Sequence, residues 1–122
     1  MPILEVEIVL DHNEALLPGL SQRLADAAGK ALGVPPGYAW VRLRALPRKQ
    51  YAESGSPVPK KIKPVFVSLM KSRLGSTAEL RKECAKLCRA LAKACGRPKE
   101  NVHIIYLPEA AGRMSFGGKL MP

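Results

Sequence analysis

The sequence predicts an α+β protein of two layers, in which a four-stranded sheet carries two helices on one face. Three observations predict this fold. Apolar residues alternate as in strands in four segments. They recur at helical spacing in two segments, and each helical segment lies between two strand segments. The second half of the chain also repeats the order of the first, which indicates two β-α-β units packed as one domain.

The first unit is expected at residues 2–55. In "MPILEVEIVL", Leu4, Val6, Ile8 and Leu10 alternate with other residues, as in a strand with one buried face. A helix follows, and because Pro18 is tolerated only in a first turn, it should start near Glu14 or later. "GVPPG" ends this helix at 33–37, and "YAWVRLRAL" at 38–46 alternates again as a second strand. The expected apolar stripe of the helix comprises Leu17, Leu20, Leu24, Ala27, Ala28 and Ala31.

The second unit is expected at residues 64–118. "KPVFVSLM" (63–70) is a strand that opens with Pro64, because proline suits the first residue of a strand. "STAE" predicts a capping box in which Ser76 and Glu79 satisfy each other's N–H groups. "VHIIYL" (102–107) is the fourth strand. The expected apolar stripe of the second helix comprises Leu80, Cys84, Leu87, Leu91 and Ala94.

The two units match closely enough to indicate an internal duplication. Pro2 aligns with Pro64, and Gly33 aligns with Gly96. The segment 56–63, rich in Pro and Lys, is the expected linker within a single domain spanning 1–122. Because both helices would cover one face of the sheet, the other face would be bare. A small protein must cover such a face, so we expect a closed oligomer.

Charge and composition narrow the classes of function. The net charge of +10 favours an anionic partner, which leaves nucleic acid, an acidic protein surface and a small carboxylate open. No apolar run approaches the ~20 residues of a membrane span, and no secretory signal is recognisable, so a cytoplasmic protein is expected. Cys84, Cys88 and Cys95 lack a second ligand pair, so we interpret them as small apolar side chains and expect no metal.

Several stretches resemble the tautomerase superfamily. They are the opening "MPI", the segment "AAGKALGVPPGYAWVRL" and the ending "CGRPKENVHIIYLPEAAGRMSFGG" at 95–118. The resemblance covers nearly the whole chain and points to the duplicated members. These are fused 4-oxalocrotonate tautomerase, malonate semialdehyde decarboxylase and macrophage migration inhibitory factor. It implies the fold of that last protein, a homotrimer, and a cofactor-independent isomerase whose base is an N-terminal proline.

On this resemblance Pro2 is the catalytic residue once Met1 is removed. A free α-amino group titrates near pH ~7.7–8.0 and a secondary amine somewhat higher. Burial and nearby cations both lower the pKa of an amine, which suits a base that works near neutral pH. Pro64 holds the equivalent position in the repeat, but its nitrogen is an amide without basicity. Of the two prolines that open the two units, only Pro2 is therefore expected to be catalytic.

The resemblance also implies a set of substrate-binding residues. Arg73 matches a carboxylate-binding arginine just past the third strand, and Lys71 is a second cation beside it. His103 matches a fourth-strand position that contacts substrate across a subunit boundary. His12 stands where short members of the family carry an arginine, so the sequence departs from their pattern at this position. Tyr51 stands where those members carry an aromatic residue. In the decarboxylase and dehalogenase branches that the chain resembles, an acidic residue near the start of the second strand activates water. No acid stands there in this sequence, so the resemblance favours keto–enol tautomerisation of a small 2-keto or 2-hydroxy-dienoic carboxylate over water-adding chemistry.

Three alternatives remain open. One is a decarboxylase or dehalogenase of the same superfamily, and another is a ligand-binding or interaction module with the same fold and weak catalysis. The third is a basic RNA-binding domain, since the order β-α-β-β-α-β also occurs in RNA-recognition domains. Those domains stack bases on aromatic side chains of central strands. The third strand here lacks that pattern, so nucleic acid is disfavoured as a partner.

Overall fold

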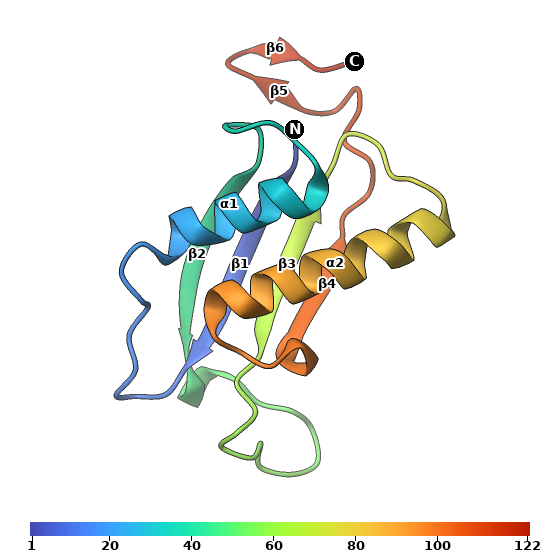
Figure 1. Cartoon of the computed structure of the whole chain (residues 1–122). Helices are drawn as coiled ribbons and strands as arrows, with labels where there is room; N and C mark the ends of the chain where they lie inside the picture. The colour runs from blue at the N-terminus through green and yellow to red at the C-terminus, as the bar shows by residue number, and fades with distance from the viewer.

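The structure, a computed structural model, describes residues 1–122 and consists of a mixed sheet with both long helices on one face (Figure 1). The sheet order is β2-β1-β3-β4. The two-layer α+β fold predicted from the sequence is confirmed. The elements are β1 (Ile3–Leu10), α1 (Leu20–Leu32), β2 (Trp40–Pro47), β3 (Val65–Met70), α2 (Thr77–Cys95), β4 (Val102–Tyr106), the short strands β5 (Ser115–Phe116) and β6 (Lys119–Leu120), and the 3-10 turns η1 (Arg48–Gln50) and η2 (Lys99–Asn101).

Each half of the chain folds as strand, helix and parallel strand. β1 pairs in parallel with β2, and β3 pairs in parallel with β4. The two halves meet where β1 runs antiparallel to β3, with Val6 opposite Val67. Because β1 and β3 run in opposite directions, the beginning of β1 lies beside the end of β3. The origin of the halves by duplication, with a joint at 56–63, stays a prediction.

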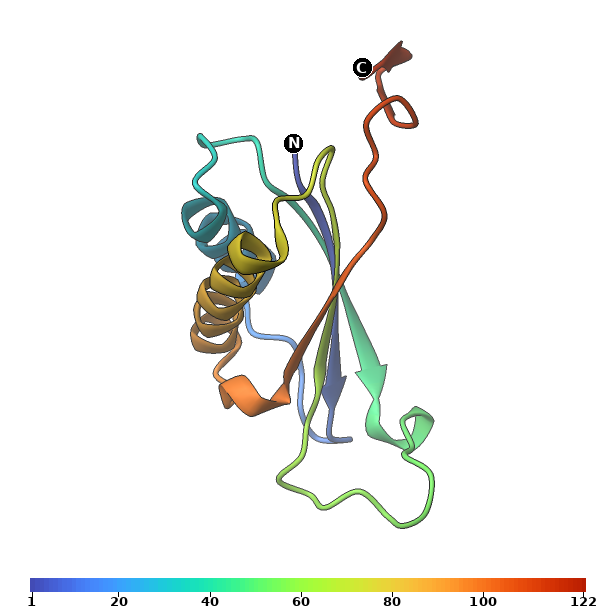
Figure 2. The same cartoon turned by 90° about the vertical axis from the view of Figure 1, so that its right-hand side faces the viewer.

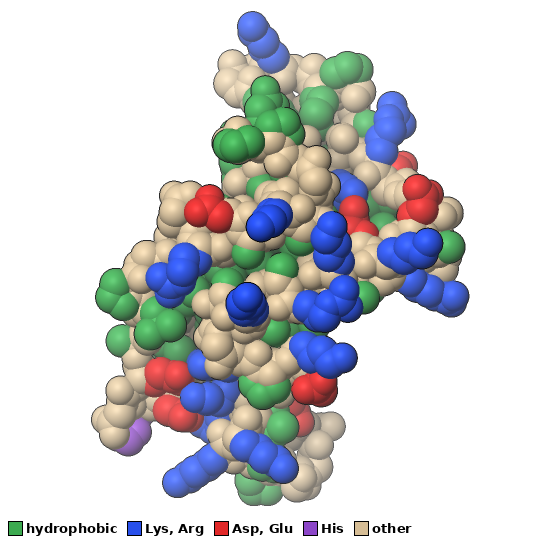
Figure 3. Space-filling model, viewed as in Figure 1, with side chains coloured by type: hydrophobic (Ala, Val, Ile, Leu, Met, Phe, Trp, Pro, Cys, Tyr) green, Lys and Arg blue, Asp and Glu red, His purple; other side chains and the backbone are tan.

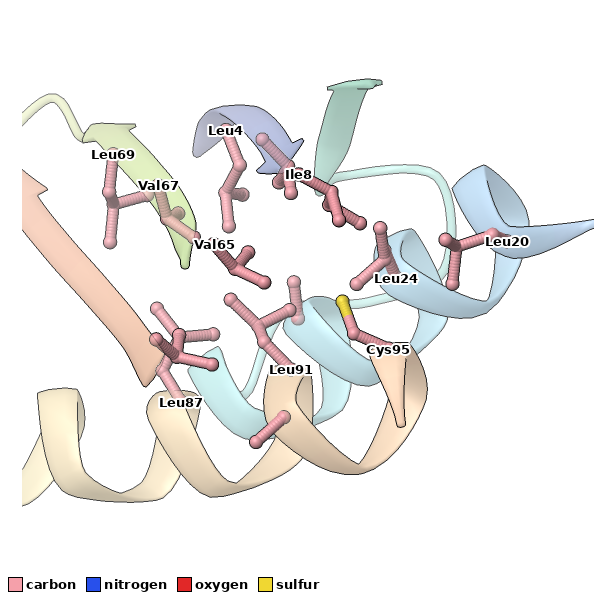
Figure 4. Packing of buried hydrophobic residues seen from close by; sticks show 14 of the residues in the cluster. Leu4, Ile8, Leu20, Leu24, Val65, Val67, Leu69, Leu87, Leu91 and Cys95 are labelled. Atoms are coloured by element: carbon pink, nitrogen blue, oxygen red, sulfur yellow. The ribbon is translucent and has the colours of Figure 1, made fainter. Parts of the chain in front are cut away.

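The core lies between the sheet and the helices (Figure 4). Leu4, Val67 and Leu69 point from the sheet towards Leu87 and Leu91 of α2, and each is at most 1% exposed. Fully burying one leucine side chain contributes about 1.5–3 kcal/mol. The alternation in β1 and β3 therefore fixes which face of each strand meets the helices. Val9 is buried as well, which the alternation does not predict.

The helix ends follow local chemistry. Ser76 caps α2, and its side chain and that of Glu79 exchange hydrogen bonds with each other's backbone N–H, so the predicted capping box is confirmed. Helix α1 begins only at Leu20, because Gly19 before it takes a left-handed backbone conformation with φ of 73°. The prediction that Leu17 belongs to the helical stripe is wrong. It precedes the helix and is 53% exposed.

Neither long helix covers the other face of the sheet (Figure 2). On this face Glu5 of β1 pairs with Arg42 of β2 at 2.7 Å. Further along the sheet the face becomes apolar, with Phe66 of β3 and Ile105 of β4. Ile105 is 60% exposed in the single chain. The bare face expected from the sequence is present, and it carries both charged and apolar side chains.

A long loop and a C-terminal hairpin lie outside the two layers. The loop between η1 and β3 is fastened by the Arg48 guanidinium, which donates hydrogen bonds to the carbonyls of Val58, Pro59 and Ile62. The β5–β6 hairpin stands beyond the end of the sheet where β1 begins, so both termini lie at that end (Figure 1). Neither long helix combines the length and the apolar character needed to cross a membrane.

Candidate active site

Pro2 lies directly before β1 and is buried. Its carbonyl accepts a hydrogen bond from the backbone N–H of Trp40 at 3.0 Å, at the first pair of the β1–β2 ladder. Leu4, Val6 and Ile8 of β1 face the helices, and Pro2 continues this alternation. The Pro2 ring therefore lies on the same side of β1 as these core residues.

Lys71 lies across the strand pair from Pro2, because Ile3 is opposite Met70 in the antiparallel register. Its ammonium nitrogen Nζ lies 2.7 Å from a carboxylate oxygen of Glu83 on α2. The hydroxyl of Tyr106 donates to the other oxygen of Glu83 at 2.9 Å. The end of β3, the end of β4 and helix α2 thus share one polar cluster beside the N-terminal end of β1.

Tyr106 stays protonated in this cluster. Burial and the hydrogen bond to the Glu83 carboxylate both raise the pKa of its phenol well above the ordinary value. Lys71 is the one cation that forms an ion pair with Glu83, and the phenol of Tyr106 adds a neutral hydrogen-bond donor to the same carboxylate. The cation of Lys71 is therefore already partly neutralised within the chain.

Arg73 differs from Lys71 because it is exposed and forms no ion pair. The segment that carries it is nevertheless held in place. The backbone N–H groups of Ala110 and Ala111 donate to the carbonyls of Lys71 and Ser72, at 3.0 and 3.1 Å. One residue further on, the Glu109 carboxylate accepts from the N–H of Leu74 at 2.7 Å. The structure presents Arg73 as an unpaired cation on an anchored loop.

The C-terminal hairpin contacts the same end of the sheet. Phe116 of β5 and Trp40 of β2 meet edge to face, with ring centroids 5.3 Å apart and planes at 90°. This is a favourable geometry for an aromatic pair. The indole N–H of Trp40 donates to the carbonyl of Gly37 at 3.0 Å, which fixes the ring. The hairpin thus adds an aromatic wall to the end of the sheet where Pro2 lies.

The structure does not bring His12, Tyr51 and His103 near Pro2 within one chain. His12 follows the end of β1, so the eight residues of that strand, about 26 Å long, separate it from Pro2. Tyr51 follows η1 at the far end of β2, and His103 is near the start of β4. Phe66 joins these two across the open face, with ring centroids 5.7 Å from Tyr51 and 5.6 Å from His103.

Two adjoining clefts of about 450 and 560 Å³ open at this far end, and Pro2 lines neither of them. Asp11, His12, Arg48 and Lys49 line both clefts. The predicted site residues therefore fall into two groups. Pro2, Lys71 and Arg73 are together at one end of the sheet, while His12, Tyr51 and His103 are at the other.

Sequence reasoning missed Glu83 and Phe116. Glu83 precedes Leu87 by one helical turn, so it borders the buried side of α2. A carboxylate at such a position usually has a partner, and this signal could have found it. Nothing in the sequence near Phe116 indicates Trp40 as its contact.

No group of three or more His, Cys, Asp or Glu side chains is close enough together to hold a metal ion. Burial raises the pKa of the Cys95 thiol to about 11.

The chain is similar to known proteins in its structure. No family model and no curated protein matches the sequence. Solved structures match it over nearly the whole chain. One is the "Q0 fused 4-OT wild type symmetric trimer", with a TM-score of 0.73, 16% identity, and coverage of 98% of this chain and 94% of that chain. The chain has the tautomerase-superfamily fold.

Two further structures extend the comparison. Pt0534 inactivated by 2-oxo-3-pentynoate matches with a TM-score of 0.71 and 18% identity, over 98% of this chain and 94% of that one. The macrophage migration inhibitory factor of Trichinella spiralis matches with a TM-score of 0.69 and 19% identity, over 96% of this chain and 97% of that one. Because the identities are below 20%, these likenesses show a shared fold and do not show a shared activity.

Proposed function

We propose that the protein is a cofactor-independent keto–enol tautomerase that acts on a small 2-keto or 2-hydroxy-dienoic carboxylate, with the Pro2 nitrogen as base. The burial of Pro2 at an end of the sheet that also carries two cations is the observation that carries this proposal. Removal of Met1 would turn the Pro2 nitrogen from an amide into a secondary amine. The tautomerase fold shared with 4-OT structures supports it.

The proposed step moves one proton. The lone pair on the Pro2 nitrogen takes the proton of the enol hydroxyl, and the oxygen becomes a carbonyl as the C=C electrons shift. The protonated Pro2 nitrogen then returns the proton to carbon, so the amine is restored and no other reactant is consumed. Arg73 holds the substrate carboxylate, and cations nearby stabilise the negative charge that develops on oxygen. Lys71 contributes less, because Glu83 already balances much of its charge.

The assembly we propose is a homotrimer in which the bare sheet faces are turned inward. Two of the matching structures are trimers of fused 4-OT proteins. The apolar part of the open face, with Ile105 and Phe66, would then be covered. In such an assembly His103, His12 or Tyr51 of a neighbouring chain would complete the site around Pro2, with His103 as the expected substrate contact.

The deciding experiment compares Pro2→Ala with Pro64→Ala. Both prolines are buried and each precedes a strand, but only Pro2 can become a free amine. The substrates are the enol form of phenylpyruvate and 2-hydroxymuconate, which is itself an enol, and their conversion is followed by ultraviolet absorbance. Intact mass first establishes that Met1 has been removed. We expect Pro2→Ala, which leaves a primary amine, to lower kcat at least tenfold, and Pro64→Ala to change it little.

Two results would overturn the proposal. One is an unchanged kcat in Pro2→Ala. The other is an equal rate for protein with and without Met1, because a retained methionine keeps the Pro2 nitrogen as an amide. If Pro64→Ala unfolds, the comparison of the two Met1 forms still decides, since their folded chains differ only at the terminus.

A further inference from the structure

The outer side of helix α2 carries a continuous row of cations. Lys82, Lys86, Arg89 and Lys93 follow one another at spacings of four, three and four residues, which places them on one line along the helix. All four are exposed. The row faces away from Leu87 and Leu91, which are buried against the sheet. Figure 3 shows Lys and Arg side chains gathered over the two helices.

This row, the α2 basic row, lacks the acidic partners that exposed helices usually carry. Each neighbouring pair in it is a like-charge pair at i,i+3 or i,i+4, an arrangement that destabilises a helix. None of the four residues takes part in an ion pair. The two acids of α2 are engaged elsewhere, since Glu79 caps the helix and Glu83 binds Lys71. The row therefore opposes helix stability, and no ion pair within the chain offsets this cost.

We propose that the α2 basic row is a docking surface for the phosphate backbone of double-stranded nucleic acid, bound without sequence preference. A line of cations about 16 Å long, at 1.5 Å per helical residue, can neutralise several phosphates of one duplex at once. Neither α1 nor α2 contains an aromatic residue on which bases could stack. Binding through this surface would therefore depend on charge alone.

A duplex fits this surface better than a membrane does. Helices that lie on membranes insert an apolar side into the lipid. The apolar side of α2, with Leu87, Leu91 and Cys95, is already buried against the sheet. The exposed side offers the lipid no apolar anchor. In addition, the helices lie on the face of the sheet opposite the bare one, so an assembly through the bare face leaves the row accessible (Figure 2). The proposal is independent of Pro2 and of tautomerase activity.

The test measures binding of the whole protein to a fluorescein-labelled 24-base-pair DNA duplex by anisotropy. A second duplex of unrelated sequence tests for sequence preference. The row variant is K82Q/K86Q/R89Q/K93Q. The matched control is K49Q/K60Q/K61Q/K119Q, which removes the same charge from exposed positions outside α2. Vesicles containing phosphatidylserine provide the alternative anionic surface, and circular dichroism checks the folding of each variant.

We expect both duplexes to bind with equal affinity. The logarithm of the binding constant should fall with the logarithm of salt concentration with a slope of about −3.6 or steeper, if four phosphates are contacted. The row variant should bind at least tenfold more weakly and the control within twofold of the original. If the row variant does not fold, K86Q and R89Q should each reduce the slope by about 0.9.

Four outcomes overturn the proposal. They are no duplex binding at 0.1 M salt, equal losses in the row variant and the control, a clear preference for one duplex sequence, and tighter binding to the vesicles than to the duplex. Equal losses would mean that only the net charge of +10 attracts DNA. Tighter vesicle binding would assign the row to anionic lipid headgroups.

Discussion

The ammonium group of Lys71 lies 2.7 Å from the carboxylate of Glu83, so two cations that are two residues apart in sequence stand in different electrostatic situations. Lys71 has a bound counter-charge and is about three-quarters buried, whereas Arg73 is exposed and unpaired. A substrate carboxylate would have to compete with Glu83 for Lys71. Arg73 is free to bind it.

This difference predicts different effects for the two variants Arg73→Gln and Lys71→Gln. Arg73→Gln should raise KM for a carboxylate substrate about tenfold, the effect of losing ~1.4 kcal/mol of binding, and should leave stability unchanged. Lys71→Gln should lower the free energy of unfolding by about 1–2 kcal/mol, because Glu83 is left without its cation. Steady-state kinetics and urea unfolding measure the two quantities. A larger rise in KM in Lys71→Gln than in Arg73→Gln would contradict this assignment.

Because the bare sheet face is partly apolar, we predict that a charged side chain placed on it prevents the chains from assembling. Ile105→Lys places a cation in the apolar part of that face and should convert the assembly to single chains. Leu17→Lys is the control, because Leu17 is similarly exposed but lies outside the sheet, at 53% against 60%. Sedimentation equilibrium measures the mass, which should be three times 13.2 kDa for the original protein and for Leu17→Lys. A mass of 13.2 kDa for the original protein would remove the trimer from the proposal.

The capping box predicts a local stability effect. Ser76→Ala removes the side-chain oxygen that accepts the N–H of Glu79 and should lower the free energy of unfolding by about 1 kcal/mol. Thr77→Ala, one residue further into the helix, should change it by less than ~0.5 kcal/mol. Thermal and urea unfolding give both values. Equal effects in the two variants would mean that the hydrogen bond contributes nothing to stability.

The surroundings of Glu14 lead us to predict that the folded protein loses stability in acid. Burial alone would raise the pKa of its carboxyl, but the N–H of Asp11 and the cations Lys63 and Arg97 lower it further than burial raises it. A carboxyl whose pKa is lower in the folded protein stabilises the fold above its unfolded pKa. That contribution is lost as the pH falls through the folded pKa. Stability should therefore decrease below the ordinary carboxyl value of 4.5.

Glu14→Gln keeps an oxygen that can accept from the N–H of Asp11 but has no charge to lose. Its free energy of unfolding should change less between pH 6 and pH 3.5 than that of the original protein. Glu7→Gln, on the bare sheet face and outside any ion pair, is the control and should keep the original pH dependence. Urea unfolding at the two pH values makes the comparison. Identical pH dependence in Glu14→Gln and the original protein would contradict it.

The fold was predictable because local patterns and burial agree. Alternation in β1 and β3 and the capping box at Ser76 and Glu79 each depend on residues close in sequence, and each is confirmed. The start of α1 was less predictable, because several residues around Pro18 allow a helix to begin. The left-handed conformation of Gly19 then decides among them.

The candidate site was predictable only in part, because it depends on contacts between distant residues. Lys71 and Arg73 were expected as site residues from the family resemblance, and the antiparallel pairing of β1 with β3 places them at the end of the sheet where Pro2 lies. The balancing of Lys71 by Glu83 could not be predicted, since it depends on how α2 crosses the sheet. Nor does strand order within one chain say which residue of a neighbour would approach Pro2. The roles of His103, His12 and Tyr51 remain predictions.

Trp40 is the only tryptophan of the chain, and its ring meets Phe116 of the C-terminal hairpin. Its fluorescence emission is therefore an intrinsic reporter of whether that hairpin is docked. A red shift on adding a ligand, without any change in far-ultraviolet circular dichroism, would reveal release of the hairpin while the sheet and helices stay intact. Opening of this end of the molecule can thus be followed in solution without attaching a dye.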